Sequence, residues 1–138
     1  MSMRILIVDH DRSFLEEVRE LLEPRGHLVV NETDPNFALE RARRWRPDLV
    51  MVSAELEACS QGDMLERLRQ LRPAPAVLLT SHLDRFDLAW QAWQKGGDEL
   101  LLKPILQPSQ LQVAMMTALQ NALCPRRQIV ELPQAAAA

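Results

Sequence analysis

The sequence has few of the residues from which metal clusters, disulfide frameworks and phosphate-binding loops are built. Only two of its 138 residues are cysteine, Cys59 and Cys124, and their spacing matches neither a metal site nor a disulfide framework. Only four are glycine, and they form no glycine-rich phosphate loop. No set of nucleophile, base and orienting group is recognisable either. We therefore expect a protein that is not an enzyme, has no metal site and suits a reducing compartment.

A strong charge of one sign and long apolar runs are also missing. The formal net charge is only −3, so the chain lacks the basic excess that binding to a phosphate backbone requires. The apolar stretch that follows Arg4 ends at Asp9, which makes it far too short for a signal peptide or a membrane span. We expect a cytoplasmic protein without direct contact to nucleic acid or membrane.

Enough apolar material is present for one domain. Hydrophobic residues make up 47% of the chain, so it can bury one core and little more. Helical periodicity is lost from Cys124-Pro125 onward, and the proline and four alanines near the end are typical of a linker. We predict one domain at residues 1–123 and a C-terminal tail or linker at residues 124–138.

Segments typical of strands and of helices alternate five times along this domain. Short apolar runs predict strands at residues 5–8, 28–30, 49–52, 76–79 and 100–102. Apolar residues at helical spacing predict helices at residues 14–22, 35–45, 64–71, 84–95 and 108–122. This alternation is the pattern of an α/β fold with a doubly wound, five-stranded parallel sheet and five helices.

Polar residues stand where four of the predicted strands end. Asp9 follows the first strand, Ser53 the third, Thr80 the fourth, and Lys103 the fifth. Because the carboxyl ends of parallel strands meet at one edge of such a sheet, we expect these four side chains to line a common crevice.

Four segments, in order and in register, carry a resemblance to a known family. They are Ile5-Leu6-Ile7-Val8-Asp9, Arg46-Pro47-Asp48-Leu49-Val50, Val77-Leu78-Leu79-Thr80-Ser81 and Gly96-Gly97-Asp98-Glu99-Leu100-Leu101-Leu102-Lys103-Pro104. With these segments the chain resembles the receiver domains of bacterial two-component response regulators over residues 4 to about 123. The resemblance implies a flavodoxin-like fold and a phosphorylation switch, in which an acidic pair binds Mg²⁺, an aspartate accepts phosphate, and a threonine and a lysine hold the phosphoryl oxygens.

The chain departs from this family pattern at the phosphate-accepting site. The acidic pair is Asp9-His10, the acceptor position holds Ser53, and Leu100 stands where the family usually has tyrosine or phenylalanine. An alcohol is not an ionised nucleophile at neutral pH unless a base activates it, and His10 is the only conceivable base. Mg²⁺ prefers anionic oxygen ligands, of which the site keeps only Asp9. We predict that Mg²⁺ binding and phosphotransfer are absent or very weak.

The retained residues also have simpler structural interpretations. Lys103 is expected mainly to neutralise Asp9 in a static ion pair, although a role in binding an anion stays open. Thr80 is as well suited to capping a turn as to touching a ligand. His10 is interpreted as part of a polar rim in preference to a metal ligand. Glu55, two residues past Ser53, is a candidate gating residue whose carboxylate pairs with Lys103.

The sequence also indicates an interaction surface. The resemblance implies that the predicted helix 84–95, strand 100–102 and helix 108–122 build the usual partner-binding and dimerising face. Phe86, Ala89, Trp90 and Trp93 share one stripe of the first helix, so we expect most of them in the core. We expect Trp93 to stay partly exposed beside Leu100, and the alternative is that both tryptophans are packed inside.

Two functions remain open from the sequence. The favoured one is a phosphorylation-independent pseudo-receiver, which acts as a protein–protein interaction module in bacterial signal transduction, binds signalling proteins and dimerises through that face. The alternative is a conventional response-regulator switch that is phosphorylated elsewhere or binds a small anionic ligand at the corner between Thr80 and Lys103.

Overall fold

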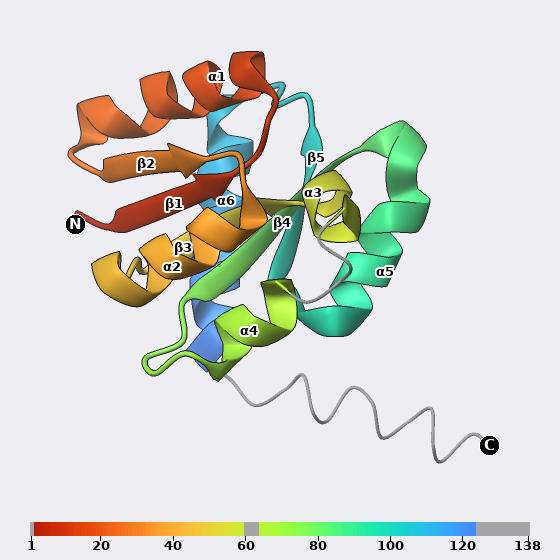
Figure 1. Ribbon diagram of the computed structural model, residues 1–138. Coiled ribbons are helices and arrows are strands. Elements are labelled where there is room, and N and C mark those ends of the chain that lie inside the picture. The colour runs from red at the N-terminus through yellow and green to blue at the C-terminus, as the bar shows by residue number, and fades with distance from the viewer. Residues whose placement is uncertain (1, 60–63, 124–138) are drawn as a thin grey trace.

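The computed structural model describes residues 2–59 and 64–123 of the chain, and five of its segments form one parallel sheet (Figure 1). The strands lie in the order β2-β1-β3-β4-β5. This order places β1, β3 and β4 inside the sheet and leaves β2 and β5 at its edges. The strands are β1 (Arg4–Val8), β2 (Leu28–Glu32), β3 (Leu49–Ser53), β4 (Ala76–His82) and β5 (Glu99–Lys103).

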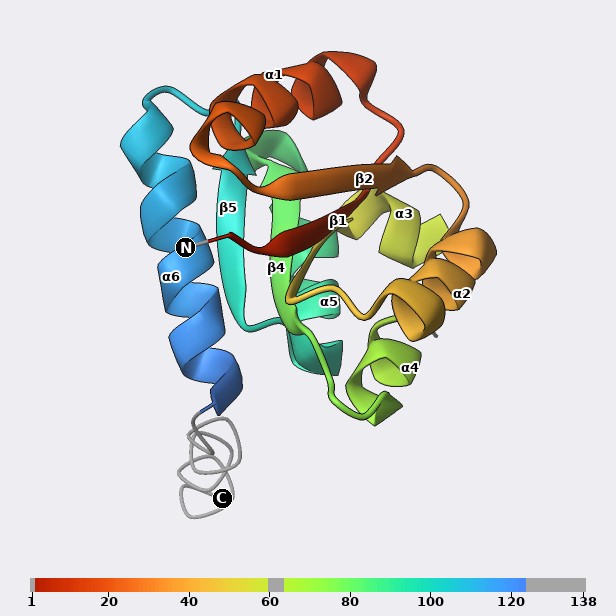
Figure 2. The ribbon, with the colours of Figure 1, turned by 90° about the vertical axis from the view of Figure 1, so that its left-hand side faces the viewer.

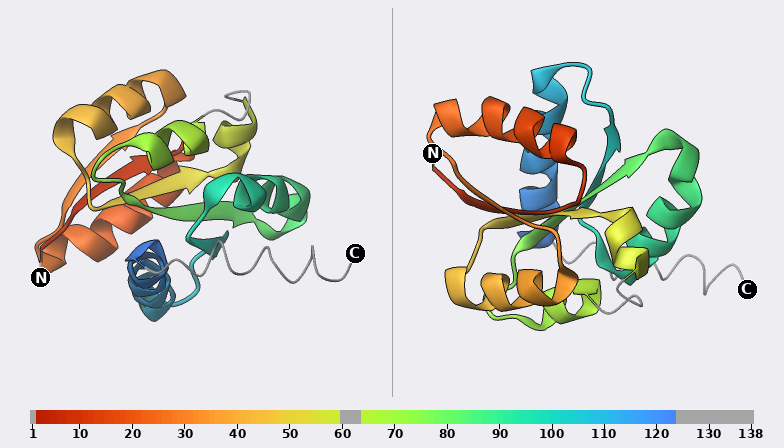
Figure 3. Two further views of the ribbon diagram at one scale, coloured as in Figure 1. Left: turned by 90° about the horizontal axis from the view of Figure 1, so that it is seen from below. Right: turned by 45° about the horizontal axis from the view of Figure 1, so that its top comes forward.

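Helices cover both faces of this sheet, as the views in Figures 2 and 3 show. One face is covered by α1 and α6, and the other by α2, α4 and α5. The helices are α1 (Arg12–Leu22), α2 (Pro35–Trp45), α3 (Ala54–Cys59), α4 (Met64–Gln70), α5 (Phe86–Gly96) and α6 (Pro108–Leu123). Short 3₁₀ turns at Glu23–Arg25 and Leu83–Arg85 connect α1 to β2 and β4 to α5.

The alternation of side chains along each strand divides the core in two. In β1, Ile5 and Ile7 pack with α1 and α6, whereas Leu6 and Val8 pack with α2 and α4. All four are fully buried. A strand that is apolar on both sides is what a sheet covered by helices on both faces requires.

The predicted fold is confirmed, with one addition. The five strands and the five expected helices are present at or close to the predicted positions. The structure adds α3, a six-residue helix that begins directly after Ser53, at the end of β3. The sequence-based prediction has no helix between Ser53 and residue 64.

The carboxyl end of α6 is fixed beside the beginning of β5. The Asn121 side-chain amide donates a hydrogen bond of 2.7 Å from Nδ2 to the carbonyl oxygen of Asp98, the residue before β5. The last described residue, Leu123, is 89% exposed. The predicted tail at residues 124–138, including Cys124, lies outside the described residues, so this domain boundary stays a prediction.

No helix in the described part of the chain is both long enough and apolar enough to span a membrane.

Candidate functional site

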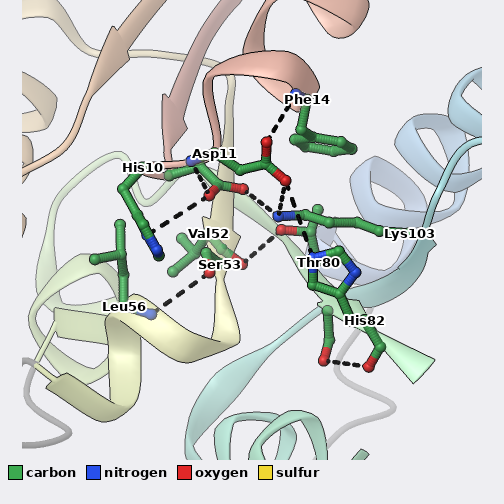
Figure 4. Close-up of polar contacts among 11 residues, drawn as sticks. His10, Asp11, Phe14, Val52, Ser53, Leu56, Thr80, His82 and Lys103 are labelled. Carbon is green, nitrogen blue, oxygen red and sulfur yellow. Dashed lines mark hydrogen bonds and ion pairs between the residues drawn. The ribbon is translucent and has the colours of Figure 1, made fainter. Parts of the chain in front are cut away.

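Four polar side chains meet at the carboxyl ends of the strands, where the sequence predicted a crevice, and Figure 4 labels three of them, Ser53, Thr80 and Lys103. We keep the name crevice for this cluster. Asp9 follows β1, Ser53 ends β3, Thr80 lies in β4, and Lys103 ends β5. Ser53 and Thr80 are register partners in neighbouring strands. The exposed fractions of the four residues lie between 1% and 7%. The parallel sheet therefore brings together the residues that the sequence predicted for this site.

An ion pair between Lys103 and Asp9 occupies the centre of the crevice. The Lys103 ammonium lies 2.7 Å from Asp9 Oδ2 and 3.8 Å from Asp11 Oδ2. The same ammonium stands 4.5 Å from the centre of the Phe14 ring, which is within the range of a cation–π contact. The ammonium is thus compensated by two carboxylates and an aromatic ring, and this arrangement holds β1 and β5 together across the sheet.

Asp11 links the crevice to α1. Its Oδ1 accepts a 3.2 Å hydrogen bond from the backbone N–H of Phe14 and so caps the amino end of α1. Its own N–H donates to Asp9 Oδ1 at 3.0 Å. The sequence-based site did not include Asp11, although an aspartate three residues before a helical apolar residue is a recognisable cap signal.

Two histidines stand at the rim of the crevice. His10 Nδ1 lies 4.0 Å from Asp9 Oδ1, and His82 Nε2 lies 3.9 Å from Asp11 Oδ2. Both side chains are largely open to solvent, with exposed fractions of 59% and 45%. The imidazoles therefore line the entrance, and the buried centre belongs to the lysine and the carboxylates.

Ser53 acts on the backbone of the helix that follows it. Its Oγ accepts a long, 3.5 Å hydrogen bond from the N–H of Leu56, which is the contact of a helix N-cap. Among the described residues, no hydrogen bond joins the Ser53 hydroxyl to His10 or to another base. Thr80 Oγ1 likewise donates at 3.5 Å to a backbone oxygen, that of Val52. Both hydroxyls are engaged with the main chain.

The proposed contact between Glu55 and Lys103 is not formed. Lys103 pairs with Asp9 and Asp11, which reach its ammonium from the loop after β1, whereas Glu55 lies in the first turn of α3. The expected pair is therefore wrong for this structure, and a gating role for Glu55 stays a prediction.

A different glutamate of α3 has a structural role that the sequence did not reveal. Glu57 is 1% exposed, and its Oε1 accepts a 2.7 Å hydrogen bond from the N–H of Leu65. Leu65 lies in the first turn of α4, so the buried carboxylate fixes the beginning of α4 to α3.

The crevice does not fit a hard divalent cation. Within residues 2–59 and 64–123, no group of three or more His, Cys, Asp or Glu side chains is arranged to hold a metal ion. Both Asp9 oxygens are already engaged, one with Lys103 and one with the Asp11 N–H. Mg²⁺ requires several oxygen ligands in near-octahedral geometry, but position 10 supplies an imidazole and position 53 a hydroxyl. The further carboxylate, Asp11, already caps α1 through Oδ1 and lies 3.8 Å from the Lys103 ammonium through Oδ2.

The second notable region is an exposed aromatic face on α5. Phe86 is 53% exposed, Trp90 51% and Trp93 37%. These aromatic side chains line a groove of about 230 Å³ between α5 and β5, together with Ala89, Glu99 and Leu100. We call this the aromatic groove. The expectation that Trp93 is partly exposed beside Leu100 is confirmed, but the expectation that most of the stripe is in the core is wrong.

Small residues explain why the large ones face outward. The side of α5 that meets the sheet is made of Ala89, Ala92 and Gly96, which are buried. A Cβ atom on the next residue, Gly97, would lie 2.5 Å from Leu79 Cδ1 and 3.1 Å from Trp93 Cε3. The helix thus lies too close to the sheet for an indole to fit beneath it, and the tryptophans remain at the surface.

Comparison with known proteins gives a consistent family match. The family model for the response regulator receiver domain matches residues 5–121. The DNA-binding response regulator MtrA of Mycolicibacterium paratuberculosis is 31% identical over 121 residues, covering 88% of this chain and 53% of that protein. A protein-glutamate methylesterase/protein-glutamine glutaminase of Rhodospirillum rubrum is 30% identical over 106 residues, covering 75% of this chain and 29% of that protein. The chain thus spans about half, or less, of these relatives.

Solved structures confirm the flavodoxin-like receiver fold. The chemotaxis response regulator CheY4 of Vibrio cholerae superimposes with a TM-score of 0.73 at 18% identity, over 86% of this chain and 99% of that chain. A response regulator receiver protein from Burkholderia phymatum gives a TM-score of 0.70 at 21% identity, over 85% of this chain and 94% of that chain. At these identities the likeness establishes the fold and nothing finer.

Proposed function

This chain belongs to the response regulator receiver family of signal-transduction proteins, and from that premise we propose that it works without phosphorylation, as a protein–protein interaction module. The observation that carries the proposal is the set of contacts that Ser53 and Lys103 make in the crevice. Ser53, which replaces the expected aspartate, caps α3, and Lys103 is compensated by Asp9 and Asp11. The chain thus has the receiver architecture with a serine at the acceptor position and a lysine that two carboxylates already compensate.

Phosphotransfer to Ser53 lacks chemical support. A serine hydroxyl becomes a competent nucleophile when a base takes its proton, and the Ser53 Oγ is instead the acceptor of a backbone hydrogen bond. His10, the residue that could act as the base, has its Nδ1 beside the Asp9 carboxylate and not beside the Ser53 hydroxyl. We propose accordingly that the chain is not an enzyme and that Mg²⁺ binds weakly or not at all.

The alternative, a conventional switch that is phosphorylated elsewhere or binds a small anion beside Thr80 and Lys103, has less support. An anion at this corner must displace two carboxylates from the Lys103 ammonium, one of them at 2.7 Å. Displacement would leave the buried Asp9 carboxylate without its counter-ion, which is costly at 1% exposure.

Recognition is proposed to take place at the aromatic groove and its surroundings. Large exposed apolar patches mark interaction sites on soluble proteins, because exposure of such side chains has no structural benefit. Tryptophan is enriched among the residues that dominate binding energy at interfaces. The partners we propose are cytoplasmic signalling proteins, including a second copy of the chain docked through the same face.

The test of phosphorylation independence is incubation with acetyl phosphate, or with beryllofluoride, in the presence of Mg²⁺. We expect neither a mass increase nor chemical-shift changes at Thr80 and Lys103. The double variant Ser53→Asp/His10→Asp, which restores both missing carboxylates, is the matched positive control. A stable phosphoryl adduct on the unmodified chain would refute the proposal.

The interaction face is tested separately, with Trp90→Ser. Trp90 is half exposed, so its replacement should leave the fold intact and remove apolar contact area from any complex. Sedimentation over a range of protein concentrations then measures self-association, which the variant should weaken. Arg43→Ser, a change on the exposed surface of α2, is the control that should leave self-association unchanged.

A further inference from the structure

The aromatic groove combines an apolar lining with one carboxylate. Five of its six lining residues are apolar, and the sixth is Glu99. Glu99 Oε1 accepts a 2.9 Å hydrogen bond from the N–H of its neighbour Leu100, and in the described part of the chain no ion pair includes Glu99. An occupant that complements this groove therefore carries aliphatic side chains together with at least one cationic group.

The chain leaves the described fold next to this groove. The hydrogen bond from Asn121 to the carbonyl of Asp98 fixes the last turn of α6 beside the residue that precedes Glu99. Figure 2 shows α6 running alongside the sheet, with its end near the beginning of β5. The carboxyl end of α6 therefore lies beside the residue that precedes the groove residue Glu99 in the chain.

The sequence after Leu123 has the required chemistry in the required order. After Cys124-Pro125 it has Arg126-Arg127 and continues with Gln128-Ile129-Val130-Glu131-Leu132. The six residues from Leu123 to Ile129 can span roughly 20 Å when extended, about twice the diameter of a helix. The extended segment is thus long enough to bring the arginines to Glu99 and the aliphatic side chains to Trp90 and Trp93.

We propose that residues 126–132 bind the aromatic groove of the same molecule and cover it until a partner displaces them. In this arrangement an arginine pairs with Glu99, and Ile129, Val130 and Leu132 contact the exposed indoles. The inference rests on the proposed interaction face and adds its regulation: the tail competes with signalling partners for one groove. Binding within one chain benefits from a high effective concentration, so modest contacts suffice.

Tryptophan fluorescence of the 138-residue chain tests this directly. The chain has three tryptophans and no tyrosine, so Trp45→Phe leaves only the two groove indoles as reporters. In that background, Ile129→Asp/Val130→Asp places charge in the apolar contact. We expect the emission to shift to longer wavelength and quenching by acrylamide to increase, because the indoles become hydrated. Without the Trp45 substitution, the indole N–H signals of Trp90 and Trp93 in NMR spectra should move in response to the same double change.

Matched variants separate this binding from a general charge effect. Gln134→Asp/Ala135→Asp adds the same charge outside the proposed segment and should leave emission and quenching unchanged. Glu99→Gln keeps an acceptor for the Leu100 N–H but removes the charge, and should give a smaller shift in the same direction as the tail variant.

Two results would overturn the proposal. One is identical emission, quenching and indole signals with and without the Ile129→Asp/Val130→Asp change. The other is a change that grows with protein concentration, which would show that a second copy, and not the same chain, fills the groove. Phosphorylation of the unmodified chain would refute the proposed function and leave this fluorescence result unaffected, so the two failures are distinguishable.

Discussion

The crevice and the aromatic groove invert the usual distribution of polarity in a soluble protein. In the crevice, the carboxylate of Asp9 and the ammonium of Lys103 are almost completely buried. On α5, two tryptophans and a phenylalanine are between 37% and 53% exposed. Charged groups are normally outside and large apolar groups inside, so each region departs from the norm in the opposite direction.

The difference between the two regions lies in how their groups are compensated. In the crevice, each charged group has a partner within the fold, and both hydroxyls bond to the main chain. On the aromatic face, the indoles lie against a groove that the described fold leaves open. The comparison shows that the crevice groups are satisfied within the fold and the groove side chains are not, which supports the proposal that recognition takes place at the groove.

The strongest test of this comparison is Lys103→Met. The change leaves the Asp9 carboxylate buried without its counter-ion, and we expect a loss of about 3–5 kcal/mol in the free energy of unfolding. Urea denaturation measures it. The control is Lys95→Met at a partly exposed position of α5 with no ion pair among the described residues, which should change stability by less than about 0.5 kcal/mol.

A loss of less than about 1 kcal/mol for Lys103→Met would show that water, and not the lysine, compensates Asp9. The double variant Asp9→Leu/Lys103→Met sharpens the interpretation. If the crevice ion pair is structural, removing both charges should recover much of the stability that the single change loses.

The second largest effect is expected for Gly97→Ala, which adds a methyl group between β4 and the aromatic side chains of α5. The backbone of Gly97 has an ordinary φ of −91°, so alanine suits its conformation, but its Cβ would meet Leu79 Cδ1 at 2.5 Å. We expect a loss of about 1–3 kcal/mol from overpacking, together with a shift of the Trp93 indole signal in NMR spectra.

Gly26→Ala is the matched control for that experiment. Gly26 has a φ of +92°, and no atom lies within 4 Å of the place that an alanine methyl group would take, so the cost of the change comes from the backbone alone. The Trp93 signal should stay in place in Gly26→Ala, and a shift there would contradict the local origin of the effect.

A smaller effect is expected for Ser53→Ala in the crevice. The alanine removes the N-cap of α3, whose hydrogen bond is long at 3.5 Å, so we expect a loss of about 0.5–1 kcal/mol. Thermal and urea unfolding measure it, and Ser53→Asn, which keeps a side-chain oxygen acceptor, should retain most of the stability. Equal stability of the alanine variant and the unmodified chain would show that the hydroxyl has no structural role.

The smallest effect is expected for His27, which directly precedes β2 and so lies at the end of the sheet away from the crevice. Burial lowers the pKa of His27 from its usual 6.5, and the positive charges of the amino terminus and Arg25 lower it further. The folded protein therefore prefers neutral His27, whose Nδ1 accepts a hydrogen bond from the Met3 N–H. Its contribution to stability is complete above pH 6.5 and is lost as the pH falls below that value.

His27→Gln should remove this part of the acid sensitivity. The free energies of unfolding of the variant and the unmodified chain should converge as the pH is lowered from about 7.5 to about 5.5, or change order. Parallel curves over this range would contradict the assignment of this acid sensitivity to His27.

The positions of the crevice residues could be predicted from the sequence because they follow from strand ends. Once Asp9, Ser53 and Lys103 are assigned to the carboxyl ends of parallel strands, the topology brings them together without knowledge of any distance. The ion pair between Lys103 and Asp9 was predicted on the same basis, and the structure contains it. The Glu55 contact failed because sequence position does not tell which of several nearby carboxylates reaches the ammonium.

Helix α3 was not predicted although its signals are present. Ser53 is a good N-cap residue, acidic residues follow at 55 and 57 in the first turn, and the segment Ala54-Glu55-Leu56-Glu57-Ala58 consists of strong helix formers. Six residues are too few for apolar periodicity to indicate a helix, so these local signals did not lead to a prediction. The burial of Glu57 is different, because nothing in the sequence indicates that Leu65 comes close to it.

Exposure of the aromatic side chains on α5 could not be predicted from periodicity alone. The helical spacing places Phe86, Trp90 and Trp93 near the buried Ala89, so the stripe resembles an ordinary core face. What decides their exposure is the distance between helix and sheet, which the small residues Ala92, Gly96 and Gly97 set. That distance is a property of packing between elements far apart in the chain.

The open indoles of α5 also predict how the proposed recognition responds to temperature and salt. Burial of aromatic surface is accompanied by a negative heat-capacity change, so the enthalpy of association at this face should become more favourable on warming, as calorimetry at several temperatures can record. Ionic strength should matter little for the indole contacts themselves, since Debye screening acts on charges and not on apolar area.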